Sequence, residues 1–120
     1  MTIDGPGSLF DQLRGEQLSA VTFVQDYLQL WFDGPGINVT SRLEVASHGQ
    51  SIVSWEPGFR DLLCAQIAKI VQQVRFESGK SLTITFEDRS ELSISLRPED
   101  RDVAEAFFAH GFKDHEWFSN

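Results

Sequence analysis

Hydrophobic and polar residues alternate strictly along residues 80–96. The apolar positions of this stretch are Leu82, Ile84, Phe86, Leu92, Ile94 and Leu96, and a charged turn divides them into two groups of three. A period of two places successive side chains on opposite faces of a strand. The stretch therefore predicts a β-hairpin with one apolar face and one face of serines and threonines.

The same pattern occurs earlier in altered form, at residues 27–40. Its apolar positions are Leu28, Leu30, Phe32, Ile37 and Val39, and its turn is Asp33-Gly34-Pro35-Gly36. The segments before the two hairpins also correspond, and Gly15 aligns with Ala68 at an offset of 53 residues. The offset is 54 residues in the next strand and 55 residues after the turn. Slips of one residue confined to turns keep the apolar side chains on the same face. The pattern indicates an internal duplication.

Each copy reads as a short capped helical turn, a strand and a hairpin, which together make a three-stranded meander. Two copies give about six strands, and their apolar faces are expected to pack on each other as a sandwich or a partly open barrel with approximate twofold symmetry. A further hairpin is predicted between the copies; its apolar positions are Leu43, Val45, Ile52, Val53 and Trp55. The predicted fold class is α+β, dominated by antiparallel strands.

A helix is predicted over residues 98–110. Pro98 suits the first helical position, and the acidic residues Glu99, Asp100 and Asp102 suit the positive end of the helix dipole. Its apolar stripe is Val103, Ala104, Phe107 and Phe108. The residues after Gly111 predict a strand or a flap that covers a sheet edge.

The 120 residues suit one domain. We expect a flexible lead-in at residues 1–7, followed by a single domain over 8–120. That domain divides into repeat one (8–42), a connecting hairpin (43–58), repeat two (59–97), and the helix and tail (98–120).

Charge and cysteine content narrow the function classes. Eighteen acidic and ten basic residues give a formal net charge of −8, which disfavours nucleic acid and anionic membrane surfaces and permits a basic partner. The single cysteine excludes an intramolecular disulfide, and the N-terminus has no basic region followed by an apolar run. A cytoplasmic protein is expected.

Candidate catalytic and metal-binding groups are weak. His110, Asp114, His115 and Glu116 lie close in sequence, but Gly111 breaks the predicted helix between them, so no metal site is predicted. Cys64 sits in an apolar helical turn and is expected to be a buried small hydrophobe rather than a nucleophile. The carboxylate pairs occupy a turn and a helix start, where solvated acidic residues are ordinary; they are Glu87-Asp88 and Glu99-Asp100, the latter with Asp102 and Glu105. No catalytic residue and no cofactor are predicted.

The two copies differ most on their polar faces. In the second copy the outward positions are Ser81, Thr83, Thr85, Ser93 and Ser95; in the first they are Tyr27, Gln29, Trp31, Asn38 and Thr40. Tyrosine and tryptophan on an otherwise polar sheet face are typical of interface anchors. Either the C-terminal helix or tail covers this face, or the face binds a partner.

The repeated residues resemble a known pattern. They are Gly15/Ala68, Leu18/Val71, Val21/Val74, Leu28-x-Leu30-x-Phe32-Asp33-Gly34 and Leu82-x-Ile84-x-Phe86-Glu87-Asp88. The chain resembles small uncharacterised bacterial proteins, domains of unknown function built from two such units, over about Leu9 to Trp117. Ala68 and Asp88 stand where glycine is more usual in that pattern. Some relatives of this kind lie near toxin–immunity or secretion loci, and the resemblance therefore implies an inhibitor-like binding role with no catalytic residues.

The sequence thus predicts a non-enzymatic protein-binding module. Its partner is expected to be a second copy of the chain or a basic protein, bound through the Tyr27 and Trp31 face with Gln29 and Asn38, through the acidic positions 99, 100 and 102, or through both. The alternative is a small-ligand binder or enzyme with a pocket between the two halves. That alternative would use His48, His110 or Glu105.

Overall fold

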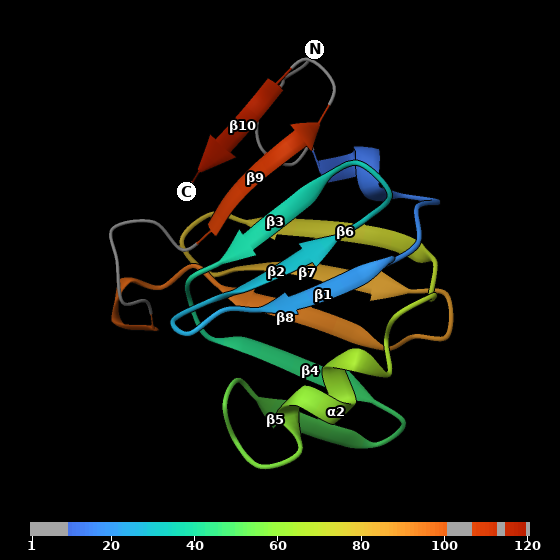
Figure 1. Cartoon of the computed structure of the whole chain (residues 1–120), viewed down its shortest axis with the longest axis vertical. Helices are drawn as coiled ribbons and strands as arrows, with labels where there is room; N and C mark the ends of the chain where they lie inside the picture. The colour runs from blue at the N-terminus through green and yellow to red at the C-terminus, as the bar shows by residue number, and fades with distance from the viewer. Residues whose placement is uncertain (1–9, 101–106, 113–114, 120) are drawn as a thin grey trace.

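The computed structural model describes residues 10–100, 107–112 and 115–119, which form two five-stranded antiparallel sheets (Figure 1). The first sheet contains, in spatial order, β1 (Ala20–Phe23), β2 (Leu28–Trp31), β3 (Gly36–Val39), β9 (Phe107–Phe112) and β10 (His115–Ser119). The second contains β5 (Gln50–Val53), β4 (Leu43–Ser47), β8 (Glu91–Ser95), β7 (Ser81–Phe86) and β6 (Val71–Glu77). The prediction of a mainly antiparallel β protein is confirmed. The predicted flexible lead-in, residues 1–7, lies outside the described residues.

Helical structure is minor in the described part of the chain. It consists of η1 (Asp11–Leu13), α2 (Phe59–Cys64) and η2 (Pro98–Asp100). Among these residues no helix is long and apolar enough to cross a membrane. The contacts of α2 include β4 and β5, at the lower end of the molecule in Figure 1.

The predicted hairpins are confirmed. In the second copy, β7 and β8 pair with Ile84 opposite Leu92, and both side chains are fully buried. In the first copy, β2 and β3 pair with Leu30 opposite Ile37, again both fully buried. The connecting hairpin forms from β4 and β5, although Trp55 lies beyond the end of β5 rather than within a strand. The period-two pattern therefore identified these three hairpins.

The predicted C-terminal helix is wrong over its last residues. Residues 107–110 belong to β9, which pairs with β3, while residues 101–106 lie outside the described part of the chain. Phe107 and Ala109 are both fully buried, and their spacing of two residues is typical of a strand with one inward face. The free edge of β3 offers backbone hydrogen-bond partners to an added strand. A helix of this length is only marginally stable by itself. The tail then adds β10, so these strands extend the sheet as Figure 1 shows.

One hydrophobic core joins the two sheets. Its buried members come from both sheets, from η1 and from α2; the largest are Phe10, Phe32, Phe59, Phe86 and Phe107. Phe10 packs edge-on against Phe107 at 5.4 Å between ring centroids. Each such ring contributes roughly 1.5–3 kcal/mol when removed from water. The short helices η1 and α2 therefore serve mainly to complete the core, with Leu13 from η1 and with Phe59 and Leu63 from α2.

A locally symmetric contact joins residues 15–18 to residues 68–71. The Gly15 N–H donates to the Val71 carbonyl (2.9 Å), and the Ala68 N–H donates to the Leu18 carbonyl (2.7 Å). Each bond has the other as its counterpart when residues 15–18 are exchanged with residues 68–71. The same holds for the bonds from the Leu18 N–H to the Lys69 carbonyl and from the Val71 N–H to the Glu16 carbonyl. Gly15 and Ala68 also share a left-handed backbone, with φ of +86° and +83°.

Candidate functional site

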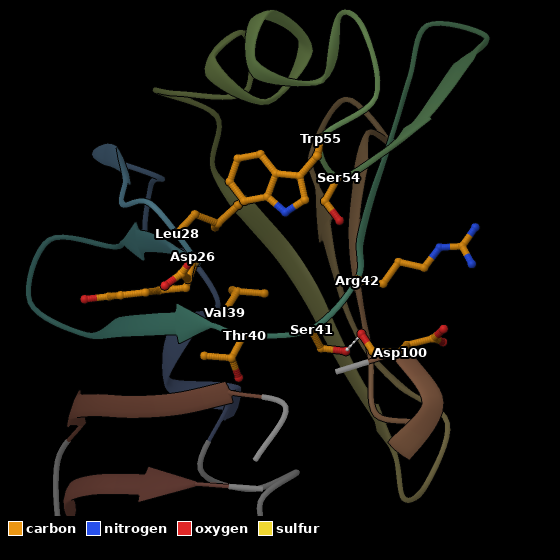
Figure 2. Close-up of a pocket in the computed structure, with 10 residues that line it drawn as sticks. Asp26, Leu28, Val39, Thr40, Ser41, Arg42, Ser54, Trp55 and Asp100 are labelled. Atoms are coloured by element: carbon orange, nitrogen blue, oxygen red, sulfur yellow. Dashed lines mark hydrogen bonds between the residues drawn. The ribbon is translucent and has the colours of Figure 1, made fainter. Parts of the chain in front are cut away.

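A crevice opens where one end of the first sheet meets the segment after β5 (Figure 2). Its volume is about 130 Å³. It is lined by Asp26, Tyr27, Leu28, Val39, Thr40, Ser41, Arg42, Ser54, Trp55 and Asp100. Apolar side chains from β2 and β3 form one wall, and the indole of Trp55 lies across the other side. The crevice combines aromatic rings, hydroxyls and charges of both signs.

A tight turn places Trp55 over the crevice. The N–H of Glu56 donates to the Val53 carbonyl (3.1 Å), and the Val53 N–H donates back to Glu56 Oε1 (3.1 Å). Trp55 is the third residue of this turn and has φ of +71°, a position and conformation that favour glycine or asparagine. A bulky residue held in this region costs about 1–3 kcal/mol, and such strain clusters at functional sites.

Trp55 is also the most exposed large hydrophobic side chain in the described residues, at 48%. It contacts the rings of Phe23 and Phe59, with centroid distances of 6.3 and 5.6 Å, and the guanidinium of Arg60 lies over both Trp55 and Phe23. Its indole N–H makes no hydrogen bond to any residue that the structure describes, and in Figure 2 the nitrogen faces the space between the labelled side chains. The ring is thus positioned by its neighbours while its donor stays available.

Fixed polar contacts close the end of the crevice at η2. The Asp100 carbonyl accepts from the Arg42 N–H and from Ser41 Oγ, both at 3.0 Å, and the Asp100 carboxylate accepts from Ser95 Oγ at 2.6 Å. Asp100 was predicted to belong to a solvated acidic helix start; instead it is a half-buried structural tie. Glu99 is exposed, and Asp102 lies outside the described residues.

The predicted aromatic face is divided by the structure. Tyr27 precedes β2 and lines the crevice, whereas Trp31 ends β2 opposite Gly36 and lines no part of it. Between them, Gln29 Nε2 donates to Asn38 Oδ1 across the strand pair at 3.1 Å. All four predicted residues of this face are half-buried. Sequence reasoning thus identified Tyr27 but missed Trp55, whose signal was its position immediately before Glu56-Pro57-Gly58.

A second polar cluster, which sequence reasoning also missed, lies at the other end of the second sheet. Lys69 Nζ contacts Asp88 Oδ2 at 2.7 Å and donates to Gln66 Oε1 at 2.8 Å and to Ser90 Oγ at 3.1 Å. The buried hydroxyls of Ser90 and Ser47 share a hydrogen bond of 2.9 Å. The Lys69 ammonium and the Ser90 N–H, which both bond to Asp88, hold the pKa of that carboxyl at about 2, below its usual 3.8. We call these five residues the Lys69 cluster.

The Lys69 cluster is organised for stability rather than catalysis. A lysine acts as a base only through a free lone pair, but this ammonium already serves three acceptors, one of them a carboxylate. Ser47 and Ser90 are only 4% and 2% exposed, so neither hydroxyl is open to a substrate. His48 lies 3.7 Å from Asp88 but is 77% exposed at its side chain. The cluster joins two hairpin turns to the segment before β6.

The remaining candidates have separate outcomes. Cys64 is exposed rather than buried, because the six-residue helix α2 turns Phe59 and Leu63 into the core and leaves its last residue outside. Within the described part of the chain, no three histidine, cysteine or carboxylate side chains are grouped as a metal site requires. The C-terminal candidates His110, Asp114, His115 and Glu116 lie outside the residues whose side chains the structure describes.

No protein-family model matches the chain, and searches of curated proteins and of solved structures also find no match. The resemblance to bacterial domains of unknown function therefore stays a prediction. Function has to be argued from the geometry of the crevice.

Proposed function

We propose that this chain is a non-enzymatic protein-binding module whose recognition surface is the crevice together with the aromatic group around Trp55. The single observation that carries the proposal is Trp55 itself. It is half exposed, it occupies a turn position that favours glycine, and its indole donor has no partner in the described residues. A large strained aromatic with an open donor is the kind of residue that anchors an interface.

The dimensions of the crevice support a protein partner over a small molecule. Pockets for small ligands usually enclose about 300–1,000 Å³, whereas this crevice has about 130 Å³. A space of this size suits one side chain of a larger partner, with the rest of the contact made on the surrounding surface. Of the residues named for the alternative, a pocket enzyme or small-ligand binder, His48 does not line the crevice, and Glu105 and the His110 side chain lie outside the described part of the structure.

The partner is a basic protein or a second copy of the chain. The net charge of −8 attracts a basic surface and speeds its encounter, which is consistent with the immunity-like role that the resemblance implies. Self-association would instead use the Tyr27 and Trp31 ends of β2. The two halves, on this proposal, are duplicated units packed as a sandwich; the symmetric bonds between residues 15–18 and 68–71 support that origin.

Site-specific crosslinking tests the proposal. A benzophenone amino acid at position 55 is expected to capture a discrete protein in lysate of the source organism, whereas the same group at Ile67, which is 37% exposed and lies outside the crevice, is expected to capture none. Equal labelling from both positions, or none from either, would contradict the proposal. Sedimentation of the native, Trp31→Ala and Trp55→Ala chains then separates a foreign partner from a second copy.

A further inference from the structure

We infer that the crevice recognises an extended, proline-containing peptide segment that carries a lysine or arginine. This inference rests on the proposed function and names the chemistry of its partner. It combines three features of the crevice: its aromatic rings, its open donors and its charge.

The rings and donors of the crevice match an extended proline segment. Such segments form a helix without internal hydrogen bonds, so their carbonyls remain available, and they dock in grooves lined by aromatic side chains. Trp55 and Tyr27 both line the crevice, and neither the indole N–H nor the phenol O–H bonds to a described residue. Each side chain therefore offers a ring face for a pyrrolidine and a donor for a backbone carbonyl.

The size and floor of the crevice favour one small apolar ring. Leu28 and Val39 form the buried floor, each 2% exposed, and the volume of about 130 Å³ leaves no room for a folded element. A proline ring fills such a space with little loss of conformational entropy, because its backbone is already restricted. The remaining segment would run across the surface beside Trp55.

The charge of the crevice adds the basic residue. Asp26 is exposed beside Tyr27, and it forms no ion pair with any residue in the described part of the chain. The cation lining the crevice, Arg42, extends away from Trp55 and Val39 in Figure 2. The chain has a net charge of −8, which attracts basic groups. A lysine or arginine of the partner would therefore bind at the Asp26 side of the crevice.

Selection from a random dodecapeptide library displayed on phage tests this inference, using the native chain as target and the Trp55→Ala chain for counter-selection. We expect enriched peptides to contain proline within a few residues of lysine or arginine. Enrichment of peptides without proline, or of acidic peptides, would overturn the inference. Failure to enrich any peptide over the Trp55→Ala chain would also overturn it.

Calorimetry with the best synthetic peptide then assigns the contacts. Trp55→Ala is expected to weaken binding at least about 30-fold, as removal of an interface anchor does. Asp26→Asn is expected to weaken it about three- to tenfold at low salt and little at high salt. The matched controls Ile67→Ala and Glu87→Gln, both exposed and outside the crevice, should leave affinity unchanged. Equal losses in the controls would contradict the inference. If crosslinking at position 55 captures a protein but the phage selection enriches no peptide, this inference is wrong while the proposed function is still supported.

Discussion

The two halves that the sequence pattern predicts share several backbone hydrogen bonds and differ in what their side chains do. In the first half, the Arg14 N–H bonds to the Asp11 carbonyl (3.1 Å); 53 residues later, the Ile67 N–H bonds to the Cys64 carbonyl at the same distance. The hairpin turns match as well, because the Phe32 and Phe86 N–H groups each bond across their turn at 2.8 Å. Backbone bonds at turns are therefore common to both halves, whatever side chains stand there.

The side chains diverge where the backbone agrees. Leu13 and Gln66 occupy matching positions and are both fully buried, but Leu13 belongs to the hydrophobic core whereas Gln66 accepts from Lys69. The first half instead contributes Asp26 and Tyr27 to the crevice, where Trp55 of the connecting hairpin joins them. Similar backbone hydrogen bonds thus carry different side chains: a buried polar cluster in the second half, and part of the proposed binding surface in the first half.

The largest expected effect tests the shared framework. Phe32 and Phe86 are both fully buried at matching positions. Replacement of either by alanine is expected to lower the free energy of unfolding by about 3–5 kcal/mol, because each change leaves a cavity in the core that joins the sheets. Urea denaturation of the two variants measures this. A large loss in one variant and none in the other would show that the halves do not contribute equally to one core.

A smaller effect tests the shared left-handed backbone. Ala68 has φ of +83° where the first half has Gly15, and a side chain at either position meets little, since a Cβ on Gly15 would have nothing within 4 Å. The left-handed conformation costs an alanine about 1–2 kcal/mol, and part of this is offset because glycine gains freedom when unfolded. Ala68→Gly is therefore expected to raise the free energy of unfolding by about 1 kcal/mol. Gly15→Ala should lower it by a similar amount, and the same sign in both would contradict the symmetry.

Strand pairs and their inward faces were predictable from sequence because a period of two leaves little freedom. Leu82 and Ile84 could face the core in only one register. The C-terminal segment was not predictable in the same way, since Phe107 fits both the apolar stripe of a helix and the inward face of a strand. The unpaired edge of β3, which is a tertiary feature, is what β9 pairs with.

The candidate site was partly predictable. Tyr27 could be found because an aromatic residue replaced a hydroxyl on a polar strand face. Trp55 was missed, because the alternating pattern assigned it to a strand, whereas its exposure depends on a turn in which it has a left-handed backbone. The Lys69 cluster was missed because Lys69 and Asp88 meet only when two separate turns come together in space.

The smallest effect tests the polar specialisation of the second half. The pKa of Asp88 is lowered in the folded state to about 2 from 3.8, so its stabilisation is fully present above pH 4 and is lost as the pH falls from about 4 to 2. The carboxyl is 36% exposed, and after screening by solvent the contribution is about 1 kcal/mol. Other carboxyls titrate in the same range, so the informative quantity is the difference between chains.

Urea denaturation at pH 4.5, 3.5 and 2.5 provides that difference for the native and Lys69→Met chains. Lys69→Met removes the strongest donor to Asp88 but leaves the Ser90 N–H, so the acid-induced loss of stability between pH 4 and 2 should shrink by about 0.5 kcal/mol or more relative to the native chain. If the free energy of unfolding falls equally with pH in the two chains, Lys69 does not lower the pKa of Asp88. The contrast between a polar second half and an aromatic first half would then depend on the crevice alone.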